Sequence, residues 1–155
     1  MNKTLVFDMD GTLADLYGVE NWLEEVRAEN PHPYEVAKPM YDMYVLYVIL
    51  TALKACGWRI AVTSWLAKYS SKEYDRLIRK VKITWLDGYN FPYDEIHIVK
   101  YGTTKANCTR RLGGYQILVD DNEEVRNGWT LGRTINAKEN IIEQLLNLLI
   151  SEVAA

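Results

Sequence analysis

The sequence predicts an α/β fold: a Rossmann-like, three-layer domain with a parallel sheet of about five strands covered by helices on both faces. The first observation is that short apolar runs alternate with helix-length stretches along the 155 residues. This pattern is typical of parallel strands joined by right-handed helical crossovers. The second is that 48 % of the residues are hydrophobic, which is enough for a buried core. We therefore expect a single core domain over 1–155.

Five apolar runs bounded by turn residues are expected to form the strands of the sheet. They lie at 4–7, 59–63, 95–99, 115–119 and 133–135, and the last is the weakest. The first run ends in Asp-Met-Asp-Gly, and Gly113-Gly114 precedes the fourth. These turn residues bound the two strands on which the functional argument depends.

Helical spacing of apolar residues predicts the connecting helices. They are expected at 17–29, 40–55, 70–86, 104–112, 123–128 and 138–152. Pro39 is expected to open the second helix and Gly57 to end it. Ser70 with Glu73 three residues later matches a capping box for the third helix, and Asn122 is expected to cap the fifth.

Residues 14–40 are an extra piece between the first strand and the helix that leads to the second. The piece is too long for a loop and too short for a domain, and Pro31 and Pro33 break its helical pattern. We therefore expect a small helical lid, inserted after the first strand, that closes over the carboxyl ends of the strands.

Charge and hydropathy exclude several classes of protein. The chain has 18 Lys and Arg against 21 Asp and Glu, a net charge of −3, and no basic block, which argues against a binder of long nucleic acid. The most apolar stretches, 41–53 and 141–150, are shorter than the ~20 residues that span a bilayer, and the first apolar run is too short for a signal peptide, so we expect none. We expect a cytoplasmic protein without membrane contact, in which Cys56 and Cys108 stay reduced thiols. The two apolar stretches either cover the sheet or pair with a second copy, so a homodimer stays open.

Polar residues gather where the predicted strands end, and these carboxyl ends share one edge of a parallel sheet, where ligands bind. That edge receives carboxylates, hydroxyls and a lysine: Asp8, Asp10, Thr63, Ser64, Lys105, Asp120 and Asp121. Four clustered carboxylates repel one another unless a cation lies between them. Oxygen ligands favour Mg²⁺, which takes phosphate as a co-ligand. Each acid alone is also ordinary turn chemistry, and it is the joint pattern that indicates a site.

The motifs at these positions resemble those of the haloacid dehalogenase superfamily of phosphotransferases. Residues 7–13 (FDMDGTL) are similar to its first motif, residues 62–64 (VTS) to its second, Lys105 to its third, and residues 118–121 (LVDD) to its fourth. The resemblance covers residues 4–136 in order and spacing. Within the superfamily, residues 8–15 (DMDGTLAD) look most like the deoxyribonucleotidase branch and its small phage-type relatives.

The resemblance implies a Mg²⁺-dependent phosphomonoester hydrolase that works through an aspartyl-phosphate. Asp8 would be the nucleophile and a metal ligand. Asp10 would act as general acid and then as general base, and its main-chain carbonyl would bind the metal. Asp120 would bind the metal directly. Asp121 would act through water or hold Lys105.

Thr63 and Lys105 would hold the phosphoryl oxygens in this mechanism. Ser64 competes with Thr63, because neighbouring side chains on a strand face opposite ways. Lys100 competes with Lys105, although it lies next to the third strand and further along the chain from Asp120.

Two histidines and a basic run are expected to have structural roles instead. His97 lies in an apolar strand and is expected to be packed, and His32 lies in a Pro-flanked loop and is expected to be solvated. The basic residues from Lys68 to Lys82 are expected to form a solvated helix face.

The aromatic residues favour a nucleotide as the substrate. Tyr (11) and Trp (5) far outnumber Phe (2), as is typical of half-exposed aromatic surfaces. Tyr17, Trp22 and Tyr34 lie on the predicted lid and Trp65 follows the second strand, and such rings stack on bases. We expect a nucleoside 5′-monophosphate, although Trp22 can equally pack the lid against the core. A 3′-phosphate at a nucleic-acid end, or a non-catalytic phosphate- or partner-binding module, are the alternatives.

Overall fold

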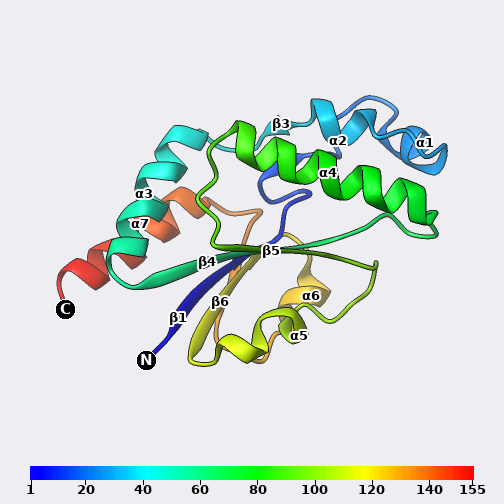
Figure 1. Cartoon of the computed structure of the whole chain (residues 1–155). Coiled ribbons are helices and arrows are strands. Elements are labelled where there is room, and N and C mark those ends of the chain that lie inside the picture. The colour runs from blue at the N-terminus through cyan, green and yellow to red at the C-terminus, as the bar shows by residue number, and fades with distance from the viewer.

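The computed structural model describes all 155 residues and is built on a five-stranded sheet with the order β5-β4-β1-β6-β7 (Figure 1). The strands are β1 (Lys3–Phe7), β4 (Trp58–Trp65), β5 (Glu95–Val99), β6 (Tyr115–Asp120) and β7 (Thr134–Asn136). Every neighbouring pair is parallel. The predicted fold class is therefore confirmed. The strand order reverses between β1 and β6, which is where ligands bind in such sheets.

Helices cover both faces of the sheet (Figure 1). One face carries α3 (Met43–Ala55), α4 (Lys72–Gly88) and α7 (Ile141–Val153), and the other carries α5 (Ala106–Thr109), the 3-10 turn η1 (Arg110–Leu112) and α6 (Glu123–Asn127). Alternation along the strands supplies both layers with apolar side chains. Leu5 and Phe7 lie in the larger core on the α3 side, while Val6 packs with Leu118 and Trp129 on the opposite side.

Residues 14–40, which we call the insertion, lie between β1 and α3, and the two ends of this segment pair with each other. β2 (Ala14–Asp15) is antiparallel to β3 (Lys38–Pro39), and α1 (Trp22–Arg27) and α2 (His32–Val36) lie between them. The insertion lies against α4 (Figure 1), where Tyr34 packs with Tyr74 and Ile78. It therefore contains a short strand pair as well as helices.

The first predicted helix, over 17–29, is much shorter in the structure, where only α1 is helical. The Asp15 side chain accepts a hydrogen bond from the main-chain N–H of Gly18 at 3.0 Å. Such a bond offers the backbone a turn in place of a helix. Asn21 then takes a left-handed φ of 58°, and the helix begins only after it.

Two further helix starts differ from the predictions near the prolines. α2 begins at His32, directly at the segment expected to break a helix, because a proline in the first turn has no intrahelical N–H bond to lose. Pro39 belongs to β3 and does not open α3. Asp42 caps α3 instead, since its side chain accepts from the N–H groups of Tyr44 and Val45 at 3.0 and 3.1 Å.

The cap of α4 is Ser71, and the prediction of Ser70 is wrong by one residue. The Ser71 Oγ accepts from the Tyr74 N–H at 3.1 Å. Ser70 Oγ instead donates to the Ala67 carbonyl at 3.0 Å, so it stabilises the preceding turn.

The structure also bears on membranes and cysteines. None of its helices combines the length and the apolar character that crossing a membrane requires. Cys56 and Cys108 are separate, partly buried free thiols, as predicted.

Candidate functional site

Strand register brings three polar side chains to one face of the sheet. Phe7 pairs with Val62 of β4 and with Val119 of β6, and all three belong to the core on the α3 side. Because side chains alternate along a strand, the next residue on each strand points to the opposite face, which carries α5. These residues are Asp8, Thr63 and Asp120. The alternation that builds the core thus also assembles the site.

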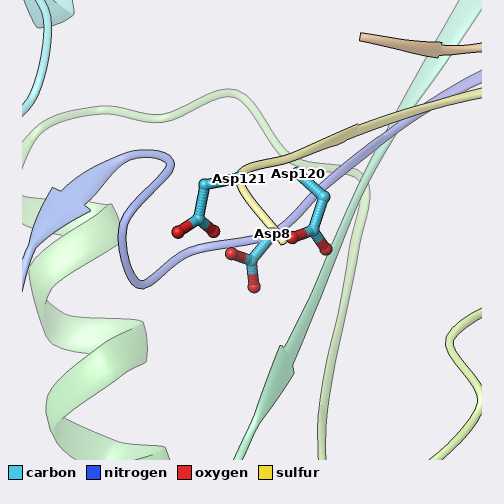
Figure 2. Close-up of side chains that lie close together, drawn as sticks. All are labelled: Asp8, Asp120 and Asp121. Carbon is cyan, nitrogen blue, oxygen red and sulfur yellow. The ribbon is translucent and has the colours of Figure 1, made fainter. Parts of the chain in front are cut away.

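An acidic cluster lies at the carboxyl ends of β1 and β6 (Figure 2). Figure 2 shows the side chains of Asp8, Asp120 and Asp121 converging, and their carboxylate oxygens lie within 4.8 Å of one another. Asp8 is 7 % exposed and Asp120 only 1 %. The cluster therefore sits at the reversal of strand order, largely removed from water.

Lys105, the residue that precedes α5, is the cation of this cluster. Its Nζ donates to Asp8 Oδ1 and to Asp120 Oδ2, both at 2.7 Å. Burial would lower the pKa of Lys105, but the charges of Asp8 and Asp120 outweigh burial and raise that pKa, so the lysine stays charged. The competing Lys100 is exposed just beyond β5, and the structure does not bring it to the acids.

The cluster carries more negative charge than Lys105 balances. Burial, followed by the nearby charge of Asp8, raises the pKa of Asp120 to about 6 and that of Asp121 to about 7. Asp120 and Asp121 therefore resist full ionisation near neutral pH unless a further cation is present. Their donor atoms are all oxygens, so the set fits a hard cation such as Mg²⁺ rather than zinc.

The turn after β1 orients the cluster. Thr12 Oγ1 donates to Asp8 Oδ2 at 3.1 Å. Gly11 has a φ of 78°, and a Cβ at this position would lie 2.4 Å from Asp121 Oδ2 and 2.8 Å from the Tyr17 ring. The two acidic motifs approach so closely that only glycine fits between them.

Thr63 and Ser64 are both fully buried but face opposite sides of the sheet. Thr63 Oγ1 has no hydrogen-bond partner and points to the side of Asp8. Ser64 Oγ accepts from Lys82 Nζ at 2.8 Å on the α4 side. Neither lines the cavity beside the acids, so the expected contacts of both residues with a phosphoryl group stay predictions.

Asp10 lies outside the acidic cluster and pairs with Lys82, whose Nζ donates to Asp10 Oδ2 at 2.8 Å. Burial raises the pKa of Asp10, and the charge of Lys82 opposes that rise. The prediction that Lys82 belongs to a solvated helix face is wrong, because its side chain is 0 % exposed. The expected metal ligand at Asp10 is its main-chain carbonyl, and this role stays a prediction.

A cavity of about 900 Å³ separates the strand ends from the insertion, a volume within the usual range for ligand pockets. The four aspartates and Lys105 line it together with six aromatic residues: Tyr17, Trp22, Tyr34, Trp65, Tyr69 and Tyr101. Tyr17 and Trp22 form an edge-to-face pair with ring centroids 4.9 Å apart, and Trp65 and Tyr101 are 5.0 Å apart. Aromatic side chains therefore lie in the same cavity as the acids, and their contact with a substrate stays a prediction.

Both histidines lie outside this cavity. His97 on β5 pairs with Glu95, and His32 in α2 pairs with Glu25 at 3.1 Å. The structure brings neither histidine to the acidic cluster.

Three residues of the site escape the sequence analysis: Thr12, Lys82 and Tyr101. Lys82 leaves a readable signal, because Tyr74, Ile78, Lys82 and Leu86 are spaced four apart along α4 and the other three are apolar. A lysine within such a row marks a buried charge rather than a solvated face. Tyr101 follows β5 in the way that Trp65 ends β4, but nothing in its sequence context indicates a cavity.

Comparisons with known proteins find a similar fold but no similar sequence. No protein-family model matches the sequence, and no curated protein sequence matches it. Among solved structures, the D,D-heptose 1,7-bisphosphate phosphatase of Burkholderia thailandensis is similar, with a TM-score of 0.56 and 10 % sequence identity. The match covers 96 % of this chain and 99 % of that chain. At this identity the two proteins share an architecture over nearly their whole lengths.

Proposed function

We propose that this protein is a Mg²⁺-dependent phosphomonoesterase that works through an aspartyl-phosphate on Asp8. The observation that carries the proposal is the buried Asp8, held by Lys105 next to Asp120 and Asp121 at the reversal of strand order. The shared fold with a sugar bisphosphate phosphatase and the resemblance of the motifs to haloacid dehalogenases support the same class of reaction.

Asp8, Asp120 and Asp121 would hold Mg²⁺ through carboxylate oxygens, with the Asp10 carbonyl as a further ligand. When bound, the ion would neutralise phosphoryl oxygens and the carboxylates around them. Lys105 would supply the second positive charge, because its Nζ lies between Asp8 and Asp120. Thr63, a buried hydroxyl without a partner, would donate to a phosphoryl oxygen.

In the first half of the reaction, a carboxylate oxygen of Asp8 bonds to phosphorus while the bond from phosphorus to the ester oxygen breaks. Asp10 gives its proton to that oxygen, and the alcohol leaves. In the second half, Asp10 takes a proton from water as the water oxygen bonds to phosphorus. The bond between Asp8 and phosphorus then breaks, which releases phosphate and restores both carboxyl groups.

The substrate that the cavity supports best is a nucleoside 5′-monophosphate. The cavity volume of about 900 Å³ accommodates a nucleoside. The rings of Tyr17, Trp22 and Trp65 offer faces and edges to a base. A 3′-phosphate at a nucleic-acid end would meet the same acids and rings. In that case the enzyme would hydrolyse 3′-phosphorylated oligonucleotides in preference to mononucleotides.

The test is hydrolysis of a panel of phosphate esters with Mg²⁺, including p-nitrophenyl phosphate, nucleoside 5′- and 3′-monophosphates, sugar phosphates and 3′-phosphorylated oligonucleotides. We expect turnover that chelation of Mg²⁺ abolishes, and a loss on the order of 10³-fold or more in Asp8→Asn. Glu139→Gln, at an exposed position, is the control. If the folded protein hydrolyses none of these esters, the proposed phosphatase activity is refuted and a non-catalytic phosphate-binding module is favoured.

The expected cytoplasmic location and the homodimer stay predictions. The apolar helices on which the homodimer rests do expose side chains on their outer faces, among them Tyr44 and Val48 of α3 and Ile150 of α7.

A further inference from the structure

We propose that Lys82, on α4, is a positioning residue that fixes the Asp10 carboxyl group for proton transfer. The inference rests on the proposed function, in which Asp10 is the general acid and base. It concerns a residue outside all four motifs, which the fold places under the active-site turn. Its basis is a set of hydrogen bonds around one completely buried ammonium group.

Lys82 has a partner for each of its three N–H donors. Its Nζ donates to Asp10 Oδ2 at 2.8 Å, to Ser64 Oγ at 2.8 Å and to the Trp65 carbonyl at 2.9 Å. An isolated ammonium group in a protein interior is strongly unfavourable. The three acceptors therefore define a socket for this lysine, and Asp10 is the only carboxylate in it.

The socket connects three parts of the molecule. Asp10 belongs to the turn after β1, Ser64 and Trp65 to the end of β4, and Lys82 to α4. The Tyr34 ring of the insertion lies over the ammonium group, with 5.1 Å between Nζ and the ring centroid. Lys82 thus ties Asp10 to the β4 end and to the insertion at a single point.

The geometry leaves one oxygen of Asp10 free for chemistry. Oδ2 is taken by Lys82, whereas no hydrogen bond involves Oδ1, and Asp10 lines the cavity with its side chain 16 % exposed. A carboxyl group anchored at one oxygen presents the other in a fixed direction. Holding a catalytic group in place is a large part of its effect on rate, so losing the anchor should slow both proton transfers without removing the acid.

The ion pair also has a structural consequence, and the test must separate it from positioning. Lys82→Met and Lys82→Gln remove the charge, and Lys80→Met, an exposed lysine on the same helix, is the matched control. With Mg²⁺ and a nucleoside monophosphate, we expect kcat to fall about 10²-fold in both Lys82 variants. KM should change less than kcat, because Lys82 contacts neither Lys105 nor the acidic cluster and holds Trp65 only by its main-chain carbonyl. A comparable rise in KM, or an unchanged kcat, would overturn the proposal.

A double-mutant cycle with Asp10→Asn adds a readout that a purely structural role would not move. If Lys82 acts through Asp10, Lys82→Gln should slow the Asp10→Asn enzyme far less than it slows the wild type. Multiplicative losses in the double mutant would instead assign Lys82 a general structural role and refute the inference.

Crystal structures of the wild type provide a further test, which requires neither measurable turnover nor a variant that folds. In the wild type with Mg²⁺ and inorganic phosphate, and also without them, Asp10 Oδ2 should stay on Lys82 while Oδ1 faces the cavity. An Asp10 side chain turned away from Lys82 in both crystals would overturn the inference. A wild type that hydrolyses no ester would refute the proposed function alone, and this crystallographic result would still decide whether Lys82 positions Asp10.

Discussion

The acidic site at the strand ends and the insertion face each other across one cavity, but different interactions hold them. Main-chain register between β1, β4 and β6 brings Asp8, Thr63 and Asp120 into one row. The insertion has a strand pair of only two residues on each side and depends on α4 for its position. Strand register thus positions the carboxylates, whereas side-chain contacts position the aromatic residues of the insertion opposite them.

Three hydrogen bonds attach the insertion to α4 along its length. Tyr74 Oη donates to the Asn30 carbonyl at 2.7 Å, the Ser71 N–H to Glu29 Oε2 at 2.7 Å, and Trp85 Nε1 to the Ala37 carbonyl at 2.8 Å. A lid that swings freely would have to break all three. We therefore expect the insertion to move together with α4, which differs from a lid hinged only at its two ends.

The largest effect should come from breaking the strand-end site and leaving the insertion intact. Lys105→Met leaves buried Asp8 and Asp120 without their cation, so the metal-free protein should lose about 3 kcal/mol of unfolding free energy. Turnover should fall on the order of 10³-fold. Urea unfolding and steady-state kinetics measure the two effects, with the exposed Lys100→Met as the control. Wild-type turnover in Lys105→Met would mean that the strand-end site is not the catalytic one.

A smaller effect, again specific to the strand-end site, is the response of stability to pH. The pKa values of Asp120 and Asp121 in the folded protein, about 6 and about 7, lie above the ordinary 3.8. The folded protein therefore binds more protons than the unfolded chain between about pH 4 and pH 7. The stability that these two groups contribute is complete below that window and is lost as the pH rises through it.

Mg²⁺ should reverse this loss, because it binds the ionised carboxylates of the folded state only. We expect millimolar Mg²⁺ to raise the melting temperature, and to raise it more at pH 8 than at pH 5. Differential scanning fluorimetry with and without the ion measures the difference. An equal shift at both pH values, or none, would count against a cation among Asp8, Asp120 and Asp121.

The smallest effect should come from loosening the insertion. Tyr74→Phe removes the hydrogen bond to the Asn30 carbonyl and should lower the unfolding free energy by about 1 kcal/mol. KM for a nucleotide should rise, whereas kcat for p-nitrophenyl phosphate should stay unchanged, because the strand-end site is untouched. Tyr44→Phe, on a side chain of α3 that is 75 % exposed and lies outside the cavity, is the control. Equal loss of kcat for both substrates would show that the two regions are not independent.

The same contrast explains what the sequence could predict. The strands are visible as apolar runs, so the sequence predicts that Asp8 and Asp120, which end two of these runs, share one edge of the sheet. The face that they share follows from the register between β1 and β6. Lys105 is predicted by a motif resemblance, and the structure places it on both acids.

The mispredicted features depend either on a contact between distant segments or on local hydrogen bonds that compete with helix spacing. The apolar row of α4 indicates that Lys82 is buried, but its partner Asp10 emerges only when α4 is placed against the turn after β1. The start of α1 depends on the local bond between Asp15 and Gly18, which competes with helix spacing. The predicted cap of α4 differs from the observed one by one residue, because a capping pattern does not locate a helix start to the exact residue.

The central claim, that Asp8 carries the phosphoryl group, is tested most directly by chemical trapping. Asp10→Asn should accumulate the aspartyl-phosphate with p-nitrophenyl phosphate, because this ester has a good leaving group and the acid is needed mainly for hydrolysis of the intermediate. After acid quenching, borohydride reduces an aspartyl-phosphate to homoserine, which mass spectrometry locates in the peptide. We predict homoserine at position 8 only when both substrate and Mg²⁺ are present. Conversion at another carboxylate, or phosphate release by the wild type with no conversion at position 8 in either protein, would contradict the account.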